Sequence, residues 1–243
     1  LKRIAEVATF LVPLMGSIYF GAMLIALTLN LDQVFPAFKL ILVDAFNGTA
    51  IAGGTFFGVL IYGVRRGAFS NEAGMGTESL VHGVAKVSDP VKQGLVAMTG
   101  PIFDTLIICT ATALMILISG VWETSTSQGV TLTAEAFSML LGNFGGFILF
   151  VCVICFGLST IFTYSYYGAS CSRFLFGKFG MKFYIYLYIF SIFIYSIVPI
   201  DIAINIADGA FAMMAIPTLV SALWLAPKVM QASKNYFKLI DSY

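Results

Sequence analysis

Six long apolar runs divide the chain, and polar or charged residues separate them. The runs cover roughly residues 7–30, 40–63, 95–120, 145–171, 183–199 and 202–226. A transmembrane helix needs about 20 predominantly apolar residues, because the hydrocarbon core of a bilayer is about 30 Å thick. The pattern therefore predicts an all-α integral membrane protein with about six transmembrane helices.

The lysines and arginines indicate how these runs are oriented. They cluster before the first run, after the second, before the third, between the fourth and fifth, and after the last. The segments 121–144 and 199–204 carry neither residue type. Cytoplasmic loops are enriched in Lys and Arg, so the runs alternate in direction and the carboxyl terminus is predicted to be cytoplasmic.

Two short elements do not fit the simple alternation. The segment 64–86 has positive charge at both ends, at Arg65, Arg66 and Lys86, so both ends are placed on the cytoplasmic side. It is predicted to be a cytoplasmic or re-entrant element. On the other side, Thr131 followed by Glu135 resembles a helix start with an N-cap and an acid in the first turn. This predicts a short external loop helix at about 132–141.

The composition supports the membrane class and narrows the function. The chain is 59% hydrophobic and 10% charged, whereas soluble domains carry about 25% charged residues. The net charge of +1 implies no bulk attraction to nucleic acid. One histidine and four scattered cysteines supply no nucleophile–base pair and no metal set, so we expect no enzyme activity. Cys152 and Cys155 have the CxxC spacing, which is also typical of small buried thiols in a membrane helix.

The second apolar run contains residues that are poor helix formers in mid-span. The relevant positions are Asn47, Gly48, Thr49, Gly53, Gly54, Thr55, Phe56 and Phe57. Small residues at such positions allow helices to pack closely. Alternatively, they form a discontinuous helix whose free amides and carbonyls bind substrate and ions. The sequence leaves both interpretations open.

Polar groups inside three other stretches are further candidates. Asp104 lies within the third run, where an acid is either functional or bonded to a neighbour such as Thr105. Ser159 and Thr160 lie within the fourth run; their hydroxyls either bond to the preceding turn or supply hard ligands to a small cation. His82 is either a proton relay or a structural residue.

One segment carries a resemblance to a known family. Residues 63–77, GVRRGAFSNEAGMGT, closely resemble the signature of the alanine or glycine:cation symporter family. The match continues at His82 and at residues 93–94, 103–105, 109–113, 159–161, 166–168, 207–208 and 214–217. It covers nearly the whole chain.

The resemblance implies a fold and an activity. The family is similar to LeuT-like (APC superfamily) inverted-repeat transporters, and the six runs would be their fifth to tenth core helices, with the second run as the broken helix. It implies a multi-pass carrier in the inner membrane of a prokaryote that imports alanine or glycine with Na⁺ or H⁺ by alternating access. No cofactor or metal is expected beyond this coupling ion.

The resemblance also assigns roles to residues. The substrate would bind at the broken run, from Asn47 to Phe57, and Na⁺ at Ser159 and Thr160. From the charge pattern, which places the signature on the cytoplasmic side, we further expect it to form an inner gate, with Arg65 and Arg66 pairing with Glu72 or Asp104. The gate and signature residues are Arg65, Arg66, Ser70, Asn71, Glu72 and Asp104. The alternative function is a membrane channel or sensor fragment, although neither charged rings nor an output domain is visible.

Some residues depart from the family pattern. The family usually has Ser-Ala-Pro where residues 77–79 read Thr-Glu-Ser, and Tyr164, Ala169 and Thr218 replace its tryptophan, acid and asparagine. A shifted substrate range is one consequence. The first half of such a carrier is also expected to be missing from these 243 residues, so the remaining partners would be its amino-terminal helices and the lipid bilayer.

Overall fold

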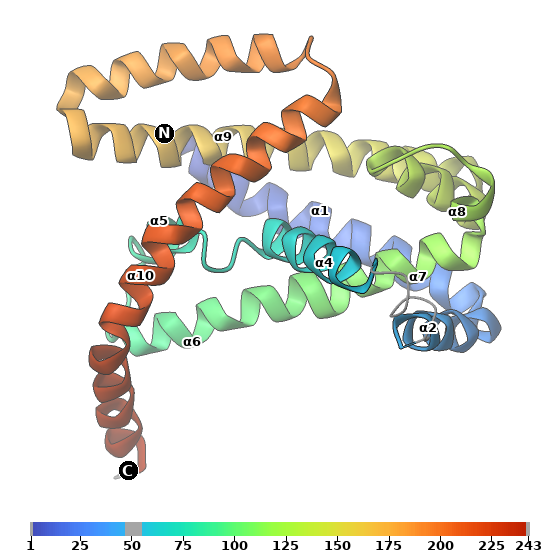
Figure 1. The fold of residues 1–243 in the computed structure, drawn as a ribbon, viewed down its shortest axis with the longest axis horizontal. Coiled ribbons are helices and arrows are strands. Elements are labelled where there is room, and N and C mark those ends of the chain that lie inside the picture. Colours follow the sequence, from blue (N-terminus) through green and yellow to red (C-terminus); the bar gives the residue numbers. More distant parts are fainter. Residues whose placement is uncertain (1, 47–54, 242–243) are drawn as a thin grey trace. The chain divides into compact units, whose positions relative to one another are not determined.

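The chain folds into helices, as the apolar pattern predicts. The computed structural model describes residues 2–46 and 55–241, and every regular element in these ranges is helical (Figure 1). The elements are α1 (Lys2–Leu29), α2 (Leu31–Ala45), α4 (Thr55–Asn71), α5 (Thr77–His82), α6 (Pro90–Pro101), the π-helix η1 (Ile102–Cys109), α7 (Thr110–Ser119), α8 (Val121–Thr124), α9 (Val130–Tyr195) and α10 (Ile200–Asp241). The all-α prediction is confirmed for these residues.

Four helical stretches in the described ranges are long and apolar enough to cross a membrane. They are Leu11–Leu29, Pro90–Ser119, Val130–Tyr195 and Ile200–Ile240. Four stretches stand where six runs were expected because the fourth and fifth runs share α9, and because the second run is divided between α2 and α4. The count of about six spans and the LeuT-like arrangement stay predictions.

Two helices, α2 and α4, contain the described helical parts of the second run. Helix α2 ends at Ala45 and α4 begins at Thr55. The predicted break at Asn47, Gly48, Thr49, Gly53 and Gly54 lies outside the described residues.

Helix α9 changes direction at two glycines. Gly142 and Gly177 both have φ of 67°, a left-handed backbone that glycine adopts without the penalty of a Cβ. A Cβ on Gly145 would collide with the Phe137 carbonyl, so the chain folds back tightly around Gly142. The expected external helix at 132–141 is the first part of α9. Helix α9 begins at Val130, so Thr131 lies inside the helix rather than at its N-cap.

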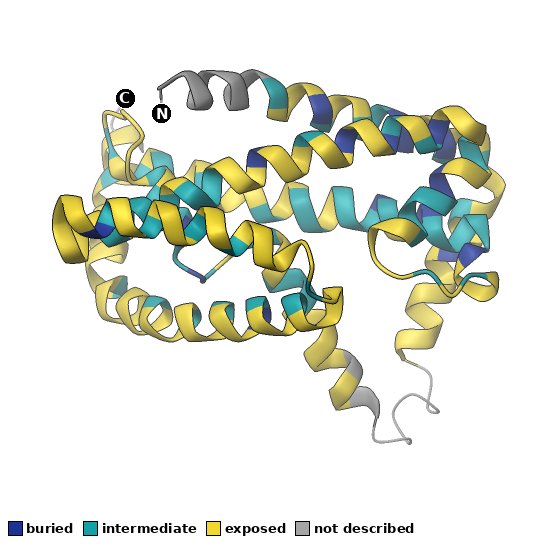
Figure 2. Cartoon of the chain, turned by 90° about the horizontal axis from the view of Figure 1, so that it is seen from above, coloured by how far each residue is buried: buried dark blue, intermediate teal, exposed yellow. Residues whose placement is uncertain are grey.

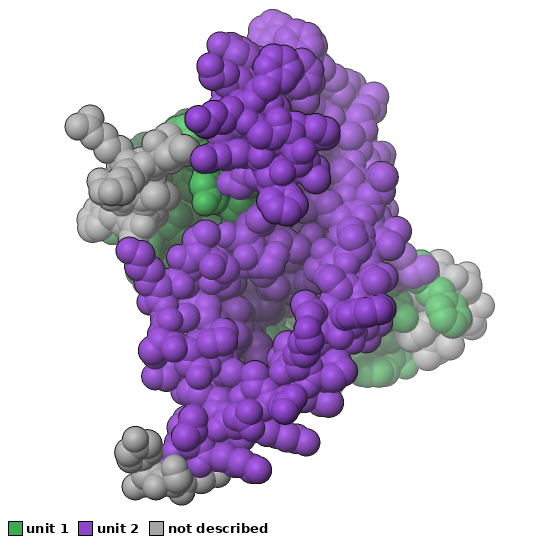
Figure 3. Space-filling model, turned by 90° about the vertical axis from the view of Figure 1, so that its left-hand side faces the viewer, with its two compact units in different colours: residues 1–60, 106–168 green, residues 61–105, 169–243 purple. Residues whose placement is uncertain are grey.

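The chain divides into two compact units, which Figure 3 colours separately. Unit 1 comprises Leu1–Leu60 and Leu106–Gly168, and unit 2 comprises Ile61–Thr105 and Ala169–Tyr243. Most side chains are exposed along the helices, and the buried ones are concentrated in small groups (Figure 2). This is the expected pattern for helices whose apolar surfaces have lipid as solvent.

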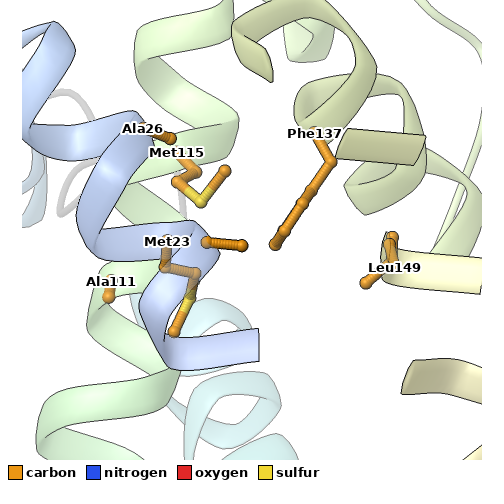
Figure 4. Close-up of a cluster of buried hydrophobic side chains, with 7 residues drawn as sticks. Met23, Ala26, Ala111, Met115, Phe137 and Leu149 are labelled. Carbon is orange, nitrogen blue, oxygen red and sulfur yellow. The ribbon is translucent and has the colours of Figure 1, made fainter. Parts of the chain in front are cut away.

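Unit 1 contains a cluster of buried apolar side chains, which we call the apolar cluster. Its members come from α1, α7 and α9: Ala22, Met23, Ala26, Ala111, Met115, Phe137 and Leu149. Figure 4 shows Phe137 pointing from α9 toward Met23 and Met115. Tyr19 stacks on Phe137 with ring centroids 5.4 Å apart, and its hydroxyl lies 2.8 Å from Thr112 Oγ1. The small alanines allow the three helices to approach, which is the usual basis of helix packing in membranes.

Candidate functional site

The candidate site lies in unit 2, where the signature segment (residues 63–79) contacts α10 and η1. The first part of the segment, up to Asn71, is the end of α4. Helical spacing places residues three or four positions apart on one side of α4. Arg65 and Phe69 therefore share one side, and Arg66 and Ser70 share another.

Two guanidinium groups converge on one carboxylate. Asp208 on α10 forms an ion pair with Arg65, and Arg66 Nη2 lies 3.7 Å from the same Asp208 Oδ2 atom. The Asp208 side chain is only 4% exposed, whereas those of Arg65 and Arg66 are 45% and 37% exposed. A charged group that is buried this far is retained in proteins when it is paired. The arginines thus hold the Asp208 carboxylate in place.

Aromatic contacts flank this ion pair. Phe69 and Phe211 meet edge to face with ring centroids 5.0 Å apart. The Arg66 guanidinium lies 5.1 Å from the centroid of the Tyr62 ring, within the range of a cation–π interaction. Because Asp208 and Phe211 are three residues apart on α10, one side of α10 receives both the charge and the ring from α4.

The next two residues of the signature connect α4 to η1. Ser70 Oγ donates to Asp104 Oδ2 at 2.6 Å, and Asn71 Nδ2 donates to Thr105 Oγ1 at 3.0 Å. Both acceptors lie in the π-helical stretch Ile102–Cys109. π-Helical turns are rare and are found frequently at functional sites. We call these four residues, together with Arg65, Arg66 and Asp208, the polar cluster.

Left-handed residues form the turn that follows α4. Glu72 has φ of 54° and Gly76 has φ of 90°, and Asn71 Oδ1 accepts the Ala73 amide at 3.0 Å. A Cβ on Gly76 would lie 2.7 Å from Thr218 Oγ1 on α10. Gly76 is therefore needed both for its backbone angle and for this close approach. The departure at Thr218 lies directly against the signature.

The arginines have a different partner from the one expected. The sequence suggested Glu72 or Asp104, but the ion pair that the structure shows for both guanidinium groups is with Asp208, and Asp104 accepts from Ser70 instead. Asp208 could have been found by the signal that indicated Asp104, an acid inside an apolar run. The π-helix had no such signal, because its sequence is also compatible with an ordinary α-helix.

The residues predicted to bind substrate are described in part. Asn47, Gly48, Thr49, Gly53 and Gly54 lie outside the described residues. The first turn of α4 contains the rest, namely Thr55, Phe56 and Phe57. Phe57 is 70% exposed. The side chains of Thr55 and Phe56 are not among those that the structure describes. Substrate binding by these residues stays a prediction.

The two hydroxyls predicted to bind Na⁺ differ in burial. Ser159 is buried, and its Oγ donates to the Phe156 carbonyl at 2.9 Å, whereas Thr160 is exposed. The Ser159 bond to the preceding turn is the ordinary one for a membrane helix. It leaves the lone pairs of the oxygen available for a cation, so the ion site stays a prediction.

His82 is the last residue of α5 and contacts α6. Its Nδ1 atom is 2.7 Å from Gln93 Nε2. The amide nitrogen of Gln93 is a donor, so Nδ1 accepts in this bond. The contact joins two helices, which is what the structural interpretation of this histidine requires.

Comparison with known proteins places these features in a family. The family model described as "Sodium:alanine symporter family" matches residues 1–242. The chain is 34% identical over 239 residues to the "Sodium/alanine symporter AgcS" of Methanococcus maripaludis, a match that covers 97% of this chain and 52% of that protein. It is 30% identical over 239 residues to the "Amino-acid carrier protein AlsT" of Bacillus subtilis, covering 98% of this chain and 51% of that protein.

A third relative has a less specific name. The chain is 34% identical over 242 residues to an "Uncharacterized transporter" of Haemophilus influenzae, covering 98% of this chain and 53% of that protein. The chain thus spans about half the length of the curated relatives it matches.

Proposed function

Because the chain belongs to the sodium:alanine symporter family, we propose that it is part of a secondary active transporter for small neutral amino acids. Alanine or glycine is the proposed substrate, and Na⁺ is the proposed coupling ion, with H⁺ as its alternative. The observation that carries the proposal is the family match over the whole chain, supported by a relative named as a sodium/alanine symporter. No further cofactor is proposed, and the carrier would not be an enzyme.

The helices support a membrane location for this activity. Four described stretches can each cross a bilayer by length and composition, and most of their side chains are exposed. We place the protein as a multi-pass component of the cell membrane of a prokaryote, with the carboxyl end of α10 on the cytoplasmic side. This orientation follows from the lysines after residue 226.

The proposed binding residues lie in two runs. The substrate's carboxylate and ammonium would bind near Asn47–Phe57 of the broken second run, where unpaired backbone groups suit both charges. Na⁺ would bind in part through Ser159 and Thr160, because hydroxyl oxygens are hard ligands. Coupling requires that each ligand strengthens the binding of the other by the same factor.

The polar cluster is proposed as the inner gate. Its ion pair connects α4 to α10, and its hydrogen bonds connect α4 to η1. A gate that opens in each cycle must exchange these bonds for bonds to water. Arg65 and Arg66 are already partly exposed, whereas the buried carboxylate of Asp208 has to become hydrated as the gate opens. Arg66→Ala should therefore reduce the turnover of the carrier more than its affinity for substrate or sodium.

Uptake by the whole protein that contains this chain tests the proposal. The protein would be reconstituted in vesicles, and labelled alanine or glycine uptake measured with an inward sodium gradient, with a proton gradient and with neither. We expect uptake above the substrate's equilibrium level only with a cation gradient. Uptake that is the same with and without the sodium and proton gradients would contradict coupled transport. Steady unitary currents in a planar bilayer would indicate a channel.

A further inference from the structure

Helix α10 is much longer than a membrane requires. It comprises 42 residues, Ile200–Asp241, and at 1.5 Å per residue it is about 63 Å long. The hydrocarbon core of a bilayer is only about 30 Å thick. The apolar run 202–226 is long enough to cross it, so the remainder of α10, residues 227–241, has to lie outside the core. We call residues 227–241 the α10 tail.

The helix has a suitable point at which to bend between these two parts. Pro227 lies inside α10, directly after the apolar run. Proline within a helix removes one hydrogen bond and kinks the axis. Figure 1 shows the dark red end of α10 departing from the direction of its preceding orange part. The tail can therefore follow a direction different from that of the membrane span.

The α10 tail has two distinct faces. At helical spacing, one face carries seven apolar residues and one serine, namely Val229, Met230, Ala232, Ser233, Tyr236, Phe237, Leu239 and Ile240. The opposite face carries polar residues, which include three lysines and one acid: Lys228, Gln231, Lys234, Asn235, Lys238 and Asp241. This is the pattern of a helix that lies in an interface.

The apolar face of the tail is open in the structure. Val229 and Met230 are 62% and 60% exposed, Phe237 is 45% exposed and Ile240 is 51% exposed. All three lysines are exposed as well. An apolar face of this size beside a row of cations needs a partner that is apolar on one side and anionic on the other.

The bilayer surface has this chemistry. The acyl-chain boundary accepts the apolar face, and anionic headgroups accept lysine side chains, whose long stems allow the ammonium groups to reach them. We propose that the α10 tail lies in the membrane interface and that its three lysines bind the headgroups of anionic lipids. This inference rests on the membrane location proposed above, but not on the identity of the transported amino acid.

Depth measurements on the whole protein test this proposal. Cys109, Cys152, Cys155 and Cys171 would be replaced by alanine, and a spin label attached at F237C or, as the matched control on the polar face, at N235C. The protein would be reconstituted in vesicles of phosphatidylcholine alone and of phosphatidylcholine with phosphatidylglycerol. Collision with oxygen, which dissolves in lipid, and with a water-soluble nickel complex reports the depth of each label.

The expected result is specific to one face and one lipid. The label at position 237 should be exposed to oxygen and shielded from nickel in the anionic vesicles, whereas the label at 235 should remain accessible to nickel. Each lysine near an anionic surface raises the ratio of membrane-bound to aqueous tail about fivefold. The triple variant K228Q/K234Q/K238Q should thus lower the ratio of immersed to aqueous label on the order of 100-fold. The variant K228R/K234R/K238R retains the charge and should behave like the parent protein.

Three outcomes would overturn the proposal. Nickel access at both positions would show that the tail is solvated. Shielding of the label at 237 from oxygen as well as from nickel would show that the face packs on protein. If the label at 237 is equally immersed with and without anionic lipid, and equally in the lysine variants, then the lysines do not bind the headgroups. Because the label reports lipid contact and not uptake, a failure of the transport proposal would remain distinguishable from each of these.

Discussion

The apolar cluster of unit 1 and the polar cluster of unit 2 connect helices in different ways. The apolar cluster joins α1, α7 and α9 through side chains such as Met23, Met115 and Phe137, all of which are fully buried. The polar cluster joins α4 to α10 and η1 through one ion-paired carboxylate and two hydrogen bonds. The apolar cluster depends on how well side-chain volumes fill the space between helices. The polar cluster depends on individual donor and acceptor atoms.

The difference indicates which region is suited to movement. Close-packed side chains lose many small dispersion contacts when they separate, and fluid acyl chains, which fit the exposed surfaces less closely, replace these contacts only in part. In the polar cluster, Arg65 and Arg66 are already 45% and 37% exposed and can exchange their bonds for bonds to water, whereas Asp208 has to become hydrated when it loses them. The difference supports the proposal that the polar cluster is a gate and extends it with a proposed scaffold role for the apolar cluster. Four substitutions test this assignment.

The largest effect is expected for Phe137→Ala in the apolar cluster. Truncation of a fully buried phenylalanine leaves a cavity and typically costs about 3–5 kcal/mol of unfolding free energy. Denaturant titration of the purified protein in detergent measures this loss. Phe144→Ala is the matched control, because Phe144 is 71% exposed and its loss leaves no cavity. Equal losses for the two variants would contradict the scaffold assignment.

The next effect is expected for Asp208→Asn, which conserves shape and removes charge. Two guanidinium groups lose their carboxylate, but both can reach water, so we expect a loss of about 1–3 kcal/mol rather than the full cost of a broken buried pair. The maximum rate of uptake should fall more than the affinity for substrate. Asp201→Asn, at the exposed start of α10, serves as the control. A change in affinity alone would move Asp208 from the gate to the binding site.

A smaller effect is expected for Gly76→Ala, in the turn beside the polar cluster. A left-handed backbone at 90° costs a residue with a Cβ about 1–2 kcal/mol, and the new Cβ approaches Thr218 Oγ1 closely. The double variant Gly76→Ala/Thr218→Ala should recover the stability that is lost through the contact with Thr218. It should not recover the stability that is lost through the left-handed backbone angle. Gly67→Ala is the control: a Cβ there meets nothing within 4 Å, and alanine is the better helix former. Thermal unfolding compares the three, and full recovery in the double variant would exclude backbone strain.

The smallest effect is expected for Met115→Leu in the apolar cluster. The side chains have similar volumes, and such swaps usually cost less than about 1.5 kcal/mol. Stability and uptake should both remain near those of the parent protein. A loss as large as that of Asp208→Asn would show that the apolar cluster also depends on exact shape, and the distinction between the two regions would fail.

The sequence predicted the helical class well because it depends on local properties. Long apolar runs around Met23 and Met115 form helices irrespective of their partners, since a membrane forces backbone groups to bond within the segment. The left-handed backbone of Gly76 is likewise a local property, because glycine adopts it without the penalty of a Cβ. The start of α9 lies at Val130, two residues before the expected start at about 132, which is within the usual variation of helix ends.

Most residues of the candidate site could be predicted from the sequence, but which of them contact each other could not. Asp104 and Ser70 were both identified from the sequence, yet their mutual hydrogen bond was not. Asp208 had the same signal as Asp104, an acid in an apolar run, but it was named only as part of the family match and given no role. The partner of an arginine depends on which helix packs beside it, and periodicity within one helix contains no such information.

By itself, the sequence determined the membrane class, the family and the location of charges along the chain. The amphipathic pattern of residues 227–241 also belongs to the sequence, because it follows from helical spacing alone. Only the tertiary structure decided that Arg65 and Arg66 share Asp208, that Thr218 lies against Gly76 and that Phe137 completes the apolar cluster. The physical reason is that hydrophobic length acts locally, whereas ion pairs and packing join residues far apart in the chain.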